Sequence, residues 1–250
     1  MNLKLTDHIS GWRRWIPQHI TNRQMLWIYK AAAVFSRISK ARIEDNAQKN
    51  RQLFREKKSP FRAGNYIENQ AEWGGVKFGS SKHSNMAYSG CEIMASCNAK
   101  LALGENVSEQ AMADMISRYE RKGAALNGEI GTSPKEIADY FKESGYEVIF
   151  SDSRNAKIVN EIGEKSDTVI VTAYNNRMDI MGKIHTVSVT KDEAGTYEVH
   201  NAYAYNRSTE SYVAKGGYGT LQDAVMNMAS APAVICIIGI RKPGRVKREG

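Results

Sequence analysis

Apolar residues recur at three- and four-residue steps in the first quarter of the chain, with arginines and lysines between them. This spacing predicts one long helix from about Thr21 to Lys58, which a Ser-Pro pair ends. A separate short helix is predicted over residues 3–20, broken near Pro17. The first quarter of the chain therefore reads as helical.

Glycines are frequent between residues 62 and 89, and apolar residues show no clear period there. We place a domain boundary at this stretch. The predicted organisation is a basic helical extension over 1–62, one main domain over 63–241 and a basic tail over 242–250.

The main domain begins with helical patterns and continues with strand patterns. Helices are predicted over 91–103, from Ser108 through Tyr119, from Pro134 to about Gly145, over 221–228, and more weakly over 155–163. Strands are predicted over 146–150, 168–173, 185–190, 196–202 and 235–241, with a hairpin turn at 191–195. Helices first and antiparallel strands later predict an α+β fold instead of alternating βαβ units.

Charge is concentrated at the ends of the chain. The net charge of +8 divides into +10 over residues 1–62, −6 over 63–240 and +4 over 241–250. The basic extension is a solvated surface, an arm that binds an anionic partner such as nucleic acid or a lipid surface, or a segment that folds back on the acidic domain.

Only three cysteines occur, without paired CxxC motifs, and the histidines lack metal-ligand spacing. We therefore expect no disulfide framework, no metal and no cofactor. The first residues form no secretory signal, and the longest apolar run is too short to span a bilayer. These features predict no transmembrane segment and a cytoplasmic protein, or one exported without a cleaved signal.

One cysteine, Cys91, begins a predicted helix directly after Ser89-Gly90. A helix N-terminus presents free N–H groups and partial positive charge, which lower a thiol's pKa toward the reactive thiolate. Cys97 and Cys236 lie within apolar runs and are interpreted as buried small hydrophobic residues.

A histidine and an asparagine sit where they could serve this thiol. His185 begins one predicted strand and Asn201 ends the next, across a hairpin. In an antiparallel hairpin the start of the first strand lies beside the end of the second, so the two side chains are predicted to meet. His200 should point to the opposite face of the sheet and is the weaker candidate. Nearby tyrosines are interpreted mainly as sheet packing.

The order Cys, His, Asn and the local motifs resemble papain-like cysteine peptidases, specifically the bacteriocin-processing peptidases that cleave double-glycine leaders, and their stand-alone relatives. The motifs are Gly90-Cys91-Glu92, His185-Thr186-Val187-Ser188-Val189 and Val199-His200-Asn201-Ala202. The similarity covers about 85–240 and does not extend to 1–62.

The resemblance implies a papain-like fold with Cys91 as nucleophile, His185 as base and acid, and Asn201 as the orienting residue. It also implies an oxyanion donor six residues before the nucleophile, where this chain has Asn85 instead of the family's glutamine. The third strand lacks the family's Asp-Pro.

The expected function is cleavage of a peptide or protein, with the extension as a possible inhibitory propeptide. One alternative is an acyltransferase or cross-linking enzyme that uses the same thiol. Another is a basic binding protein on a degenerate scaffold, without catalysis.

Overall fold

The computed structural model describes residues 20–82, 84–174, 184–228 and 233–244 of the 250-residue chain. It is an α+β structure built on one antiparallel sheet, as the order of predicted elements indicates. The predicted helix over 3–20 and most of the basic tail fall outside the described residues. Within these ranges, none of the helices combines the length and hydrophobicity that a bilayer crossing requires.

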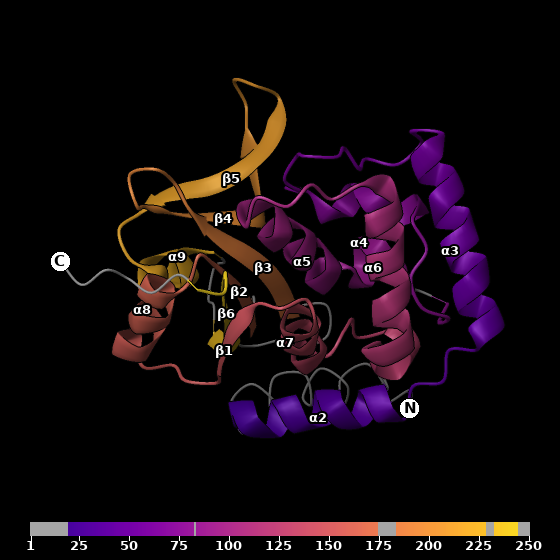
Figure 1. Cartoon of the computed structure of the whole chain (residues 1–250), viewed down its shortest axis with the longest axis horizontal. Coiled ribbons are helices and arrows are strands. Elements are labelled where there is room, and N and C mark those ends of the chain that lie inside the picture. The colour runs from indigo at the N-terminus through magenta and orange to yellow at the C-terminus, as the bar shows by residue number, and fades with distance from the viewer. Residues whose placement is uncertain (1–19, 83, 175–183, 229–232, 245–250) are drawn as a thin grey trace, which may run out of the picture.

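The sheet has six strands in the order β1-β6-β2-β3-β4-β5 (Figure 1). Their bounds are β1 Glu147–Ser151, β2 Thr168–Tyr174, β3 Ile184–Lys191, β4 Tyr197–Asn206, β5 Ser211–Tyr218 and β6 Ala233–Arg241. All neighbouring pairs run antiparallel. Strand β5 was not among the predicted strands. The predicted hairpin joins β3 to β4, with Ser188 opposite His200.

Helices cover both faces of this sheet (Figure 1). Alternation along β2 shows the division: Ile170 packs with the core of the larger helical layer, whereas Val169 and Val171 pack with the opposite core. The larger layer contains α5 Cys91–Ala102, α6 Glu109–Lys122 and α7 Pro134–Glu143, and the smaller one α8 Ala156–Lys165 and α9 Leu221–Asn227.

The N-terminal quarter forms two helices, so the prediction of one helix over 21–58 was wrong. These are α2 Asn22–Val34 and α3 Lys40–Arg55. The main-chain N–H of Arg37 donates to Asn127 Oδ1 at 2.7 Å. The Ser36 hydroxyl also donates to Asn127 Oδ1 and accepts from the main-chain N–H of Asn127. These three bonds fix the chain in a non-helical turn. Ser39 then caps α3. A contact with a distant loop thus ends α2.

Helix α3 belongs to the core that includes the main domain. The ring of Phe54 packs at a tilt against Phe61 and edge-on against Trp73, with ring centroids 5.6 and 6.5 Å away. Asn46 donates from Nδ2 to the carbonyl of Gly79 and to Glu120 Oε1. Two short helices, the 3-10 helix η1 Gln70–Gly75 and α4 Met86–Ser89, lie between α3 and α5. Part of the 1–62 segment is therefore integral to the packing.

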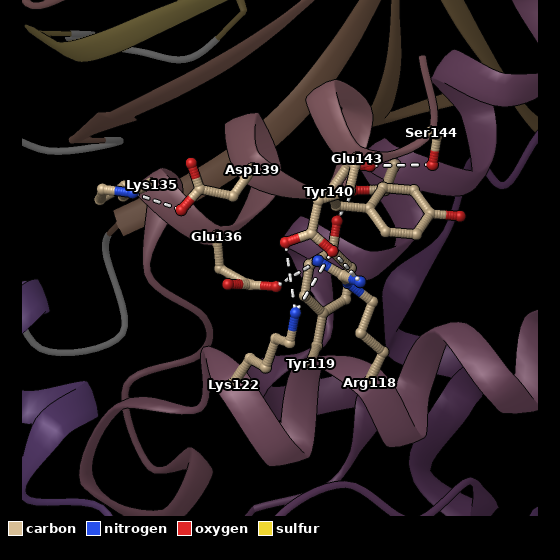
Figure 2. Close-up of polar contacts among 10 residues, drawn as sticks. Arg118, Tyr119, Lys122, Lys135, Glu136, Asp139, Tyr140, Glu143 and Ser144 are labelled. Carbon is tan, nitrogen blue, oxygen red and sulfur yellow. Dashed lines mark hydrogen bonds and ion pairs between the residues drawn. The ribbon is translucent and has the colours of Figure 1, made fainter. Parts of the chain in front are cut away.

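A charged network joins α6 to α7 (Figure 2). Arg118 donates to Glu136 and to Glu143, both at 2.9 Å, and lies over the ring of Tyr140. Lys122, on α6 like Arg118, also forms an ion pair with Glu143. Because Glu136 is buried, its pairing with Arg118 offsets the cost of removing its charge from water. The network fixes α6 and α7 to each other, and both helices pack against α5.

Candidate active site

Cys91 is the first residue of α5, as its position after Ser89-Gly90 predicts. The helix needs glycine at position 90, because a Cβ there would lie 2.5 Å from the carbonyl oxygen of Met86. Helix α4 can therefore turn directly into α5. The Cys91 side chain is only 6% exposed.

The thiol donates to Glu92 Oε2 at 3.3 Å, not to the imidazole of His185. Burial raises the pKa of Cys91 well above its ordinary value, the charge of Glu92 raises it further, and hydrogen bonds with Thr186 oppose both effects. The expectation that the helix N-terminus leaves Cys91 with a lowered pKa is therefore wrong for the buried thiol of this structure.

Glu92 was noted only as part of a motif, yet it is a central ionisable group of the site. It is 1% exposed, and burial raises its pKa to about 7, although hydrogen bonds from Cys91, Thr132 and Thr186 lower it. Gly131 allows this packing, because a Cβ there would lie 2.8 Å from both carboxylate oxygens. Sequence offers one signal for it: a carboxylate next to the predicted nucleophile.

His185 lies at the start of β3 and is buried. Its Nε2 is 2.7 Å from the main-chain carbonyl oxygen of Asn201, and its ring stacks on Tyr203. A carbonyl oxygen only accepts, so Nε2–H donates and the neutral ring keeps its lone pair on Nδ1. Burial lowers the pKa of His185, and the bond to Asn201 partly opposes this shift.

Two residues connect the histidine with the thiol. Thr186 follows His185 in β3 and hydrogen-bonds to Cys91. Tyr203 stacks on His185 with ring centroids 5.3 Å apart, and its pKa is raised to about 12 first by burial and then by the charge of Cys91. Helix α5 also packs against β3. The strand that bears His185 therefore lies against the helix that begins at Cys91, although 94 positions separate the two residues in the sequence.

Asn201 meets His185, but through its main chain and not through the side chain that the resemblance implies. Its φ is +59°, a conformation that asparagine tolerates better than most residues. The side-chain oxygen accepts from the main-chain N–H of Gln70 at 3.0 Å, and Nδ2 donates to Gln70 Oε1 at 3.3 Å. These bonds hold the peptide so that its carbonyl faces the imidazole.

Glu68 and Gln70, which the sequence did not single out, clamp this turn. Glu68 accepts from the N–H of Asn201 at 2.9 Å and pairs with Nδ1 of His200 at 2.6 Å. Gln70 Nε2 donates to the carbonyl of Ala87 in α4, the helix that precedes Cys91. Gln70 thus ties the histidine side of the site to the cysteine side.

His200 and Asn85 have structural partners. His200 is buried, and its Nε2 lies 2.8 Å from Thr190 Oγ1, while Tyr66 stacks on its ring. Asn85 caps α4, with Oδ1 accepting from the N–H of Tyr88 at 3.0 Å. The cap engages the oxygen of Asn85 and leaves Nδ2 as the donor of that side chain.

Helix α2 contributes a residue from the basic extension. Tyr29 is buried, and its pKa is raised first by burial and then by the charges of Glu92 and Cys91. Around it, Met25 and Ala32 pack with Tyr174 and Ile184 at the end of the sheet that bears His185. Tyr29 therefore lies buried within electrostatic range of Glu92 and Cys91.

The described residues contain no group of three or more His, Cys, Asp or Glu arranged to hold a metal ion. Cys97 and Cys236 are buried free thiols, and burial raises the pKa of each to about 12. Comparison of the chain with protein-family models and with curated protein sequences gave no significant match. What this site does is therefore inferred from its own residues.

Proposed function

We propose that the chain is a cysteine peptidase in which Cys91 is the nucleophile and His185 the general base. The observation that carries the proposal is the hydrogen bond between Nε2 of His185 and the main-chain carbonyl of Asn201. The Nε2–H of His185 is engaged by this carbonyl, so the basic Nδ1 is the nitrogen left for a thiol proton. A thiol and an oriented imidazole are the parts that nucleophilic acyl transfer needs.

In this mechanism Nδ1 of His185 accepts the proton of Cys91 as the sulfur attacks the substrate carbonyl carbon. The protonated imidazole then gives that proton to the leaving amine as the C–N bond breaks, which leaves a thioester on Cys91. Water, activated by the same nitrogen, attacks the thioester and releases the acid. Asn201 acts as a positioning residue through its carbonyl.

The developing oxyanion requires N–H donors. The main-chain N–H of Cys91 lies at the N-terminus of α5, where it has no carbonyl partner within the helix. Asn85 Nδ2 is the second donor in this proposal, since the α4 cap occupies the oxygen of that amide.

Helix α2 is proposed to hold the enzyme in a latent state. Three observations support this: Cys91 is 6% exposed, Tyr29 of α2 is buried within electrostatic range of Cys91 and Glu92, and the pKa of Cys91 is raised mainly by burial. When α2 withdraws, substrate reaches the thiol, water solvates the thiolate, and the pKa of Cys91 falls.

The test is peptide hydrolysis on a mixture of peptides of varied sequence, followed by mass spectrometry. Cys91→Ala and His185→Ala should each lower the rate at least a hundredfold, whereas Cys97→Ala, as the matched control, should leave cleavage intact. An added amine separates hydrolysis from acyl transfer, because transfer shifts the product mass. Cleavage that persists in Cys91→Ala would refute the proposal.

A further inference from the structure

The outer face of α2 presents apolar and cationic side chains together. Trp27 is 69% exposed and Val34 70%, and Phe35 directly after the helix is 76% exposed. Arg23, Trp27, Lys30 and Val34 follow one another at three- and four-residue steps, so they form one stripe along the helix. Tyr29 and Met25 face the opposite way, into the protein. The stripe is therefore separate from the buried face of α2 that carries Tyr29.

A groove of about 430 Å³ lies beside this stripe, between α2 and α7. Its apolar lining comes from Leu26 and Trp27 on α2, Ala138 on α7 and Phe150 on β1. Four cations also line it: Arg23, Lys30, Lys135 and Lys142. It therefore combines an apolar lining with positive charge.

Most of this charge is not neutralised within the protein. Asp139 is the acidic residue of the lining, and it pairs with Lys135 on the same helix (Figure 2). Within the described part of the chain, the side chains of Arg23, Lys30 and Lys142 have neither a hydrogen bond nor an ion pair. The groove thus carries a net charge of about +3 at neutral pH, which complements an anionic partner.

We propose that the outer face of α2 and this groove form a docking surface for a membrane that contains anionic lipid. Tryptophan beside lysine and arginine is the combination that favours the membrane–water interface. The most exposed apolar groups stand out from the surface, which suits insertion among headgroups better than capture of a peptide. The three cations then contact lipid phosphates, while the apolar lining of the groove contacts the first acyl carbons.

This proposal does not depend on catalysis, so Cys91→Ala is expected to bind membranes as the unmodified chain does. The assay is co-flotation of the full chain with vesicles of phosphatidylcholine alone, or with about one third phosphatidylglycerol. Binding is expected only to the anionic vesicles. Trp27→Ala should weaken it several-fold, since the interfacial side chain is removed.

Charge reversal at the three cations supplies the decisive comparison. Arg23→Glu/Lys30→Glu/Lys142→Glu should lower the vesicle partition coefficient about tenfold or more. The matched control reverses two lysines and one arginine elsewhere on the exposed surface, Lys82→Glu/Lys157→Glu/Arg207→Glu, and should change it less than threefold.

Three outcomes would overturn the proposal: equal binding to neutral vesicles, an equal loss in the control variant, or no effect of Trp27→Ala. Poly-glutamate is added as a competitor, at a concentration of negative charge equal to that of the anionic lipid. Binding of poly-glutamate with the same dependence on Trp27 and the three cations, together with displacement of the vesicles, would assign the surface to an acidic protein segment instead.

Discussion

At the scale of single residues, Glu92 is expected to make the stability of the protein depend on pH. Its pKa is about 7 in the folded protein and 4.5 in its ordinary surroundings, so between these values the folded state binds more protons than the unfolded state. Stability should therefore be full below pH 4.5 and fall as pH rises through 7. Linkage puts the total loss at about 3 kcal/mol.

Glu92→Gln should abolish this loss, because glutamine imitates the protonated carboxyl and does not ionise. We expect the free energy of unfolding of this variant, relative to the unmodified chain, to rise by about 3 kcal/mol between pH 4.5 and 8 in urea titrations. Glu161→Gln is the control for the direction of the effect. Because Lys165 lowers the pKa of Glu161, the free energy of unfolding of this variant, relative to the unmodified chain, should fall as pH rises. A pH-independent difference for Glu92→Gln would contradict this assignment.

The sequence predicted that His185 and Asn201 would meet, but it did not predict which atoms of Asn201 make the contact. His185 and Asn201 do meet, and Cys91 does begin a helix, because the hairpin and the helix start were readable from local patterns. The orienting role of the Asn201 carbonyl was not readable, since it depends on a φ of +59° that Glu68 and Gln70 enforce. Gln70 lies 131 positions from Asn201, and no local pattern connects them.

At the scale of elements, α2 is proposed to restrain the enzyme through its buried face. Tyr29→Ala should increase peptide cleavage several-fold, because it opens space beside Cys91 and admits water to the thiol. Trp27→Ala is the matched control: it removes an aromatic group from the exposed face of the same helix and should leave cleavage in vesicle-free buffer unchanged. An equal effect of both substitutions, or none from Tyr29→Ala, would refute the latency proposal.

Elements that bury a regular apolar face were predicted well. Helix α5 begins at Cys91 as expected, and β2 and β3 match their predicted ranges within a residue or two. Strand β5 was missed because it is an edge strand with mostly exposed or half-buried side chains and two consecutive glycines, which weaken its alternation. The break between α2 and α3 was missed because Asn127, a distant residue, fixes it.

At the scale of the whole molecule, the N-terminal segment and the main domain share a core. Phe54 on α3 is fully buried against Phe61 and Trp73. We expect Phe54→Ala to lower the free energy of unfolding by about 3–5 kcal/mol, as measured by urea titration. Circular dichroism and tryptophan fluorescence should report one coincident transition.

Gln52→Ala, on the exposed side of the same helix, is the control and should cost less than about 1 kcal/mol. Two separate transitions, or a Phe54→Ala effect as small as that of Gln52→Ala, would show that α3 is an independent arm. Removal of residues 1–62 would expose this core, so the point variants on α2 are the cleaner test of inhibition.

The central claim is that Cys91 is a nucleophile activated by His185, and thiol labelling tests it most directly. The unmodified chain, Tyr29→Ala and Tyr29→Ala/His185→Ala are treated with iodoacetamide, and the adducts are mapped by mass spectrometry. We expect labelling at Cys91 in preference to Cys97 and Cys236, faster in Tyr29→Ala and at least tenfold slower when His185 is also replaced. The claim would be contradicted if Cys91 were not labelled in Tyr29→Ala, or if the added His185→Ala substitution left its labelling rate unchanged.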